Sequence, residues 1–124
     1  MFHKAESFDG YLAGWQTWNV HDMASVFEGA ENYNQWLGNW DAYNVTDASK
    51  MFKDAKRYSK GLETLDIPNV RHINSMFEGA VNFDQWLGGS WWDPKSVIDM
   101  GRIFKVRPAW CVCVCVMLRL DIVF

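Results

Sequence analysis

Two segments of the chain are nearly identical, VFEGAENYNQWLGNW at 26–40 and MFEGAVNFDQWLGGSW at 76–91. Their separation of 50 residues contains two periods, because an aromatic residue recurs every 25 residues. The members of this column are Phe2, Phe27, Phe52, Phe77 and, after two additional residues, Phe104. A period of this length is typical of solenoids, propellers and other repeat arrays.

Apolar residues occupy several further columns with the same period. These columns are Leu12, Leu37, Leu62 and Leu87; Trp15, Trp40, Leu65 and Trp92; Val20, Val45, Val70 and Val97; Met23, Ala48, Ile73 and Met100; and Val26, Met51, Met76 and Ile103. One repeat unit cannot bury such a face alone, so neighbouring units must stack on it. We therefore expect equivalent side chains to lie above one another at about 4.8 Å, the spacing of paired strands.

Each unit begins its second half with a helical pattern. The apolar residues from Val45 to Phe52 are spaced as on one face of a short helix. Gly29 and Gly79 follow such segments, where a helix end favours a left-handed residue, and Asp54 occupies this position in the middle unit. The pattern therefore predicts one short helix in each unit.

The first half of each unit has the pattern of a short strand, since Leu65 and Ile67 alternate with polar neighbours. An asparagine column that can hydrogen-bond the turning backbone follows it: Asn19, Asn44 and Asn69. The sequence thus predicts an α/β repeat solenoid over residues 1–105. Its leucine-rich-repeat-like coils have about 25 residues, each with a short strand plus a short helix.

Residues 106–124 form an apolar tail in which the repeat stops. Cys111, Cys113 and Cys115 would share one face of a strand, but structural zinc needs four ligands, usually more widely spaced, so we expect no metal. The tail either covers the last coil or is sequence that does not fold. Because the chain opens within a unit and the pattern ends after Phe104, we expect a fragment of a longer repeat array.

Composition excludes several functional classes. The net charge is −3 and the twelve Lys and Arg are scattered, whereas a nucleic-acid interface needs a clustered basic face. The amino-terminal residues do not form a signal peptide, and no stretch is long enough to span a bilayer. No nucleophile–base set or Gly-rich phosphate loop occurs, so we expect neither an enzyme nor a cofactor. His72 stands in the column of Asp22, Asp47 and Asp99, where we expect an exposed helix start rather than a catalytic site.

The side chains between the buried strand positions are candidate ligand-binding residues, because they point out of the strand face. The candidates on this face are Trp18, Asp41, Tyr43, Asp66, Trp91 and Asp93. Their carboxylates suit a cationic or polyhydroxylated partner, while the alternative is a solvated polar face. Calcium is less favoured, because no ligand-dense Asp-x-Asp loop occurs.

An aromatic pair, Trp36 and Trp86, is the alternative candidate site. The two residues lie two coils apart, with Tyr11 in the same column, so their rings would be about 10 Å apart. Exposed aromatics suit stacking on sugars or packing on a protein. The competing interpretation is that both rings fold back and shield the core.

The pattern W-D-x-x-N-V-T-D-x-S-x-M-F-x-x-A-x-x-Y, which begins at Trp40, resembles the BspA-like leucine-rich-repeat surface proteins. It is most similar to the variant repeat of mycoplasma lipoproteins, and the resemblance extends from Phe2 to about Phe104. The resemblance implies display at the cell surface or secretion, with a role in adhesion or in binding other proteins. It implies no catalytic residues.

We therefore expect a non-enzymatic binding or adhesion module that engages a protein or glycan on a cell or matrix surface through the strand face. The alternative is a structural spacer in a longer repeat array, with no ligand of its own. We expect no nucleic-acid partner. The apolar surface at the open ends of the solenoid also predicts self-association.

Overall fold

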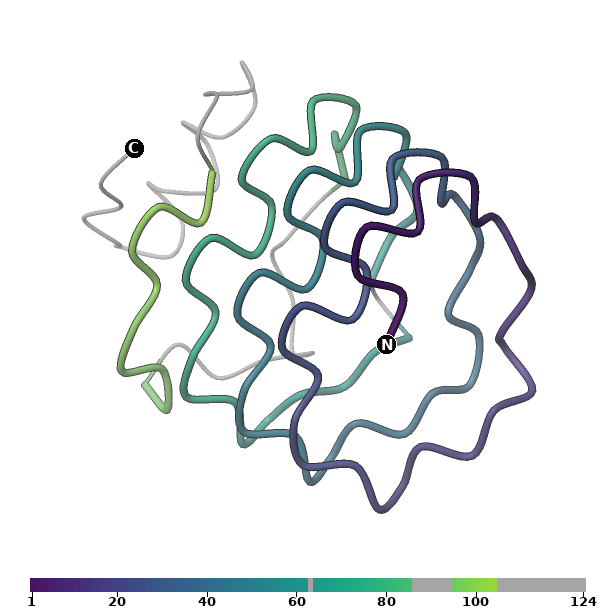
Figure 1. Cartoon of the computed structure of the whole chain (residues 1–124). Coiled ribbons are helices and arrows are strands. Elements are labelled where there is room, and N and C mark those ends of the chain that lie inside the picture. The colour runs from purple at the N-terminus through teal and green to yellow at the C-terminus, as the bar shows by residue number, and fades with distance from the viewer. Residues whose placement is uncertain (63, 86–94, 105–124) are drawn as a thin grey trace.

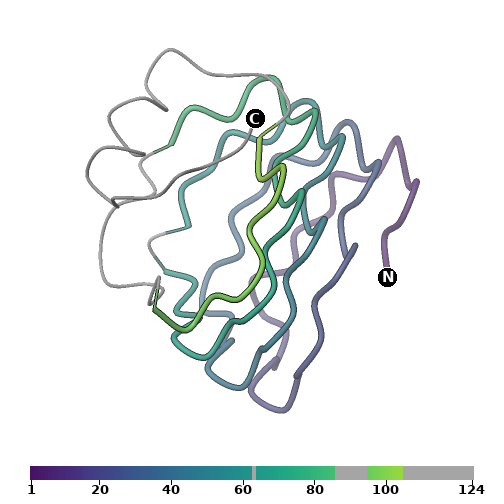
Figure 2. The same cartoon turned by 90° about the vertical axis from the view of Figure 1, so that its left-hand side faces the viewer.

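The computed structural model describes residues 1–62, 64–85 and 95–104, and these residues form a stack of coils (Figures 1 and 2). After an amino-terminal segment at 1–9, we define coil 1 as residues 10–34, coil 2 as 35–59, coil 3 as 60–84 and coil 4 as 85 and 95–104. Each coil lies beside the next along the stack, from the amino-terminal end on the right of Figure 1 to coil 4 on the left. The predicted tail at 106–124, with its three cysteines, lies outside the described residues.

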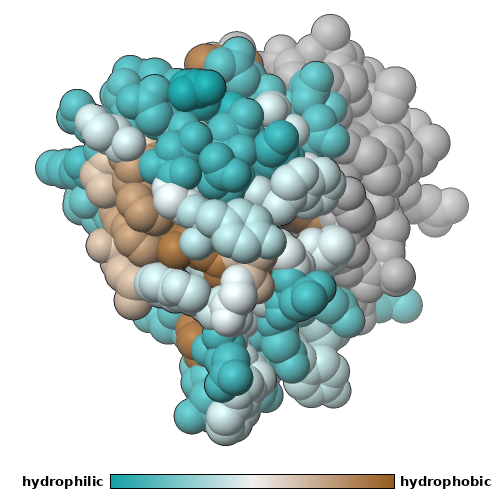
Figure 3. Space-filling view, turned by 90° about the vertical axis from the view of Figure 1, so that its right-hand side faces the viewer, coloured by the Kyte–Doolittle hydropathy of each residue, from teal (hydrophilic) through white to brown (hydrophobic). Residues whose placement is uncertain are grey.

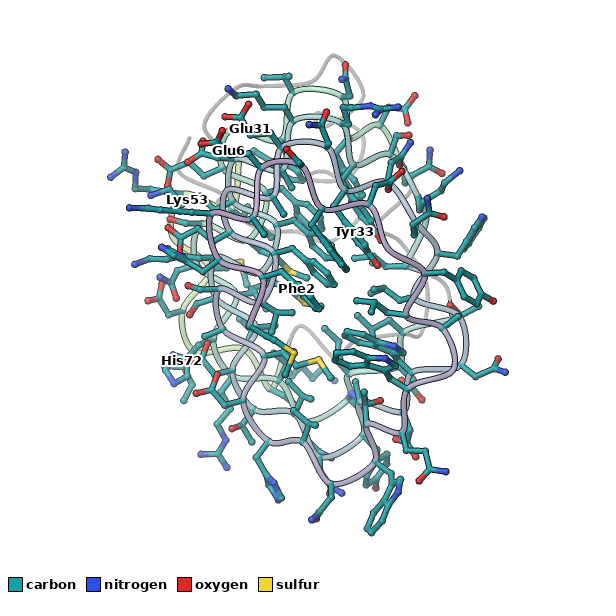
Figure 4. All side chains as sticks on the ribbon, turned by 45° about the vertical axis from the view of Figure 1, so that its right-hand side comes forward. Phe2, Glu6, Glu31, Tyr33, Lys53 and His72 are labelled. Atoms are coloured by element: carbon teal, nitrogen blue, oxygen red, sulfur yellow. The ribbon has the colours of Figure 1, made fainter. Side chains whose placement is uncertain are left out.

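Two columns of aromatic rings form the centre of the core. Consecutive rings of the column Phe2, Phe27, Phe52, Phe77 and Phe104 have centroids 5.7, 5.4, 5.7 and 5.6 Å apart. A second column contains Phe8, Tyr33, Tyr58 and Phe83, at 5.6, 6.0 and 6.0 Å. Phe2 and Tyr33 point into the interior of the coils, whereas Glu6, Glu31 and Lys53 point outward (Figure 4). The 25-residue period therefore superimposes ring on ring.

Backbone hydrogen bonds join the coils in one consistent direction. The N–H groups of Met23, Ser25, Phe27 and Gly29 donate to the carbonyls of Asp47, Ser49, Met51 and Lys53, at 2.8 to 2.9 Å. The same alternate pattern joins coil 2 to coil 3 and coil 3 to coil 4. Only alternate N–H groups take part, so the intervening ones need partners within their own coil.

Those intervening N–H groups close tight turns. Val26 donates to the Met23 carbonyl at 3.4 Å, and Glu28 donates to the Ser25 carbonyl at 3.2 Å. Ser25 has a φ of 57° and Gly29 a φ of 72°, both in the left-handed region. A right-handed helix cannot pass through these residues, because its hydrogen bonds require helical φ at every position.

The predicted short helix is therefore wrong: in the three described ranges the chain contains no helix, and the segment from Val45 to Phe52 forms turns. The apolar spacing of that segment suits both structures, since successive turns also return a side chain to the core. The prediction of left-handed residues is confirmed at Gly29, Gly79 and Asp54, with φ of 72°, 75° and 57°. These residues end turns rather than helices.

The bridges between described residues of adjacent coils lie outside the predicted strand, at positions where a helix start was expected. Leu65 and Ile67 are both 1% exposed and Asp66 between them is exposed, so the expected alternation of burial is confirmed. However, the only inter-coil pairings defined between described residues are isolated parallel bridges, joining Asp22, Asp47, His72 and Asp99 in succession. The coils are thus held together by a turn-based ladder and not by strands within the part of the chain that the structure describes.

Polar side chains secure the turns of the coils. Asn44 Nδ2 donates to the Trp18 carbonyl at 2.9 Å, and Asn69 Nδ2 donates to the Tyr43 carbonyl at 2.8 Å. These bonds confirm the predicted role of the asparagine column at Asn44 and Asn69. The carboxylate of Asp47 accepts from the Ser49 N–H at 2.8 Å, which makes it the cap of a turn and not of a helix.

Candidate functional site

Large aromatic side chains are exposed in two neighbouring pairs. Trp18 and Tyr43 are 59% and 58% exposed, and lie in equivalent positions of coils 1 and 2. Tyr11 and Trp36 form a second such pair, 74% and 43% exposed. Transferring a ring of this size from water to an apolar contact is favourable, so exposed pairs of this kind are typical of binding surfaces.

The described part of the predicted strand face is exposed throughout. Trp18, Asp41, Tyr43 and Asp66 all reach solvent. The Asp41 carboxylate accepts a hydrogen bond from the Tyr43 N–H at 3.0 Å, so it fixes the backbone from which the Tyr43 ring extends. The remaining predicted members, Trp91 and Asp93, lie outside the described residues.

The alternative aromatic pair is half described. Trp36 is partly covered, because Lys60 Nζ lies 6.0 Å from the centroid of its ring. This distance is at the limit of a cation–π contact, so the lysine shields one face of the ring only weakly. Trp86 lies outside the described residues, and the predicted distance between the two rings stays a prediction.

A polar groove crosses the coils at the edge where they turn. This site was not predicted from the sequence. It has a volume of about 460 Å³ and is lined by His21, Asn44, Thr46, Asn69, Arg71, Ser96 and Ile98. The lining residues belong to two columns of the 25-residue period. The sequence therefore contains the periodic signal for this groove, but asparagines that recur at the end of a segment are equally well explained by structural hydrogen bonds.

An apolar cavity of about 490 Å³ lies beside the amino-terminal coil, lined by Met1, Trp15, Thr17, Val20, Asp22, Met23, Ala24, Val26 and Trp40. Figure 3 faces this end of the stack and shows an apolar patch surrounded by hydrophilic residues. Trp40, which lines the cavity, is buried and donates from Nε1 to the Leu12 carbonyl at 2.8 Å. The predicted self-association through such a surface stays a prediction.

Charged side chains of the described residues form ion pairs between adjacent coils. Lys56 contacts Glu31 at 2.6 Å, and the hydrogen bond to this carboxylate raises the pKa of Lys56. His72 is half-buried and points outward (Figure 4), paired through its backbone with Asp47 and Asp99. Over residues 1–62, 64–85 and 95–104, no three His, Cys, Asp or Glu side chains converge as metal ligands do.

The comparisons with known proteins place the chain in a family. The family model described as "Mycoplasma protein of unknown function, DUF285" matches residues 1–110. Because this match covers most of the chain, the chain belongs to the DUF285 family. Neither the curated proteins nor the solved structures contain a match to it.

Among the residues that the structure describes, none forms a helix with the length and apolar character needed to cross a bilayer.

Proposed function

We propose that this chain is a non-enzymatic binding module that engages a protein partner through the predicted strand face, the exposed surface of Trp18, Asp41, Tyr43 and Asp66. One observation carries the proposal: Trp18 and Tyr43, in equivalent positions of adjacent coils, are 59% and 58% exposed. Aromatic rings of this kind dominate the energetics of protein interfaces. Their position on a rigid stack also lowers the entropy that binding must overcome.

The carboxylates beside the rings support a partner with basic groups. Asp41 and Asp66 are exposed and occupy equivalent positions of coils 2 and 3. Neither carboxylate has a cationic partner among the described ion pairs. Exposed carboxylates at the edge of an interface contribute mainly to the association rate and to specificity. Their attraction to basic groups weakens as the salt concentration rises.

The finer family assignment is part of the same proposal. The repeat pattern that begins at Trp40 resembles the BspA-like leucine-rich-repeat surface proteins. We infer a leucine-rich-repeat solenoid whose coils are built from turns, displayed on a cell surface or secreted. In this role the stack holds the exposed rings toward a host or matrix protein.

The test is a binding screen of the 124-residue chain against immobilised matrix proteins, with two pairs of variants. The double variant Trp18→Ala with Tyr43→Ala is expected to weaken a saturable interaction by at least about tenfold, as for a hot-spot pair. Tyr11→Ala with Trp36→Ala is the matched control, because it removes the other exposed pair. Circular dichroism establishes that each variant is folded.

Each result of the screen distinguishes the proposed sites. Loss of binding only in the Tyr11 and Trp36 variant would move the site to the alternative aromatic pair. A folded chain that binds none of the proteins would favour the spacer function. Equal affinity of both variants and the original chain would exclude the exposed rings as the binding surface.

A further inference from the structure

We propose that the polar groove at the turning edge of the coils binds an acidic saccharide, a sugar chain that carries carboxylate or sulfate groups. This inference goes beyond the proposed protein partner and concerns a separate surface. It depends on the composition of the groove, on its rigid backbone and on the cation that it contains.

Two columns of side chains form the walls of the groove. One column is Asn44, Asn69 and Ser96, and the other is His21, Thr46, Arg71 and Ile98. Coils 2 to 4 thus each contribute residues two positions apart, such as Asn44 and Thr46, to the two columns. The groove therefore runs along the stack, across several coils, as suits a chain-like ligand.

The floor of the groove is held by hydrogen bonds between coils. The Thr46 N–H donates to the His21 carbonyl at 2.9 Å, and the Arg71 N–H donates to the Thr46 carbonyl at 2.8 Å. The Ile98 N–H continues the series to the Arg71 carbonyl at 2.7 Å. Because these bonds fix the backbone before any ligand arrives, the side-chain groups need little ordering on binding.

The asparagines are oriented by their own hydrogen bonds but are not saturated. Each of Asn44 and Asn69 uses one N–H on a backbone carbonyl. An amide has two N–H donors and two acceptor lone pairs, so each retains both kinds of group. The hydroxyls of Thr46 and Ser96 add further acceptors. Mixed donors and acceptors match sugar hydroxyls, which both donate and accept.

Arg71 makes the groove selective for an anion. Its side chain is exposed, and the ion pairs formed among the described residues leave its guanidinium without a carboxylate partner. By contrast, Arg102 in the next coil contacts Glu78 at 3.4 Å. Among the described residues that line the groove none is acidic, although the chain as a whole carries a net charge of −3. A guanidinium binds carboxylate and sulfate oxygens through paired N–H donors.

The same features argue against other acidic polymers. A nucleic acid carries a dense row of phosphates and needs a row of cations, whereas this groove has one arginine and one histidine. An acidic peptide is normally recognised through apolar side-chain pockets, a free sheet edge or a cluster of arginines. The described lining of the groove has one aliphatic residue, Ile98, and one arginine, so a hydroxyl-rich chain fits better.

The experiment titrates the 124-residue chain with four size-matched oligomers at low ionic strength. The probes are a hyaluronan oligosaccharide, a chondroitin sulfate oligosaccharide, a neutral dextran and polyglutamate. We expect saturable binding of at least one acidic oligosaccharide, and at least tenfold weaker binding of dextran and polyglutamate. The stronger of the two acidic oligosaccharides identifies carboxylate or sulfate as the preferred group.

Two substitutions and one control locate the site. Arg71→Gln is expected to weaken acidic-oligosaccharide binding by at least about tenfold, since a charge-assisted hydrogen bond is lost. Thr46→Val removes one hydroxyl and is expected to weaken it by about threefold. Arg57→Gln is the matched control because Arg57 is also exposed and the charge change is the same. It is expected to leave binding unchanged.

The proposal is overturned if no acidic oligosaccharide binds, if Arg71→Gln binds as the original chain does, or if Arg57→Gln has the same effect. Binding of polyglutamate as strong as that of the sugars would also exclude it. The Trp18 and Tyr43 residues are unchanged in these variants, so failure here leaves the proposed protein-binding surface separately testable. Circular dichroism of each variant verifies the fold.

Discussion

Phe52 and Tyr58 stack within coil 2, with ring centroids 4.1 Å apart and planes 16° apart. The same arrangement joins Phe27 to Tyr33 in coil 1 and Phe77 to Phe83 in coil 3, also at 4.1 Å. Coils 1 to 3 therefore each contribute one such pair, and the pairs superimpose along the stack. Loss of a ring from a central coil affects the packing of both neighbouring coils.

Phe52→Ala is expected to lower the free energy of unfolding by about 3–5 kcal/mol, because the ring is fully buried and contacts rings of both adjacent coils. Chemical denaturation followed by circular dichroism measures the change. Tyr43→Ala is the control, with an expected change within about 0.5 kcal/mol, since that ring is 58% exposed. Equal effects of the two substitutions would contradict the aromatic core.

Tyr33→Phe is expected to leave stability at neutral pH unchanged or to raise it by up to about 1 kcal/mol. The Tyr33 hydroxyl is buried and has no hydrogen-bond partner, so its removal relieves a desolvation cost. Tyr43→Phe, at an exposed position, serves as the control. A loss above about 1 kcal/mol would mean that the Tyr33 hydroxyl is hydrogen-bonded.

The same tyrosine predicts a loss of stability in alkali. Burial, and secondarily the Asp9 carboxylate, raise the pKa of Tyr33 above its ordinary value of 10.0. A pKa that is higher in the folded chain gives stability that is complete below the unfolded value and is lost as the pH rises through the folded one. We therefore expect unfolding free energy to fall above about pH 10, and to fall less in Tyr33→Phe. Tyrosinate absorbance measured against pH provides an independent check.

Gly79→Ala is expected to destabilise the chain by about 1–2 kcal/mol. Its φ is 75°, where an L side chain is strained, and an added Cβ would overlap the Asp54 carboxylate. Gly14→Ala is the control, because nothing lies within 4 Å of its Cβ position. Thermal unfolding compares the two, and the penalty should decrease in an Asp54→Gly background. An equal loss of stability from Gly79→Ala in both backgrounds would attribute the whole effect to backbone strain.

Asn69→Ala is expected to cost about 1 kcal/mol, because it removes the 2.8 Å hydrogen bond to the Tyr43 carbonyl. Asn39→Ala tests an exposed asparagine for which the structure records no such bond, and should be nearly neutral. Denaturant unfolding of both variants gives the difference. Similar values for the two would show that the asparagine column contributes little to the turns.

Much of the core was predictable from the repeat alone. The aromatic column from Phe2 to Phe104 was expected and is stacked, and the leucines at 12, 37 and 62 are buried. Such positions are predictable because a side chain that stacks on its own copy must recur at the coil period. The exposure of Trp18 and Tyr43 followed from the same grid, since each of them neighbours buried positions.

The polar groove was not predicted, because its residue types differ from coil to coil. His21, Thr46 and Arg71 occupy one column but share no chemistry, so no motif identifies them as a set. Whether the guanidinium of Arg71 has a carboxylate partner depends on where the carboxylates of other coils lie. That information exists only in the folded stack.

The sequence by itself determined the coil length, the buried columns and the left-handed positions at Gly29, Asp54 and Gly79. Tertiary structure decided the backbone conformation between these positions, which in the described residues is a series of turns and not a helix. Apolar residues at helical spacing suit a helix as well as a series of turns, so periodicity does not distinguish the two. The choice follows from hydrogen bonding: alternate N–H groups from Met23 to Gly29 bond to the next coil. Those acceptors are available only once the coils have stacked.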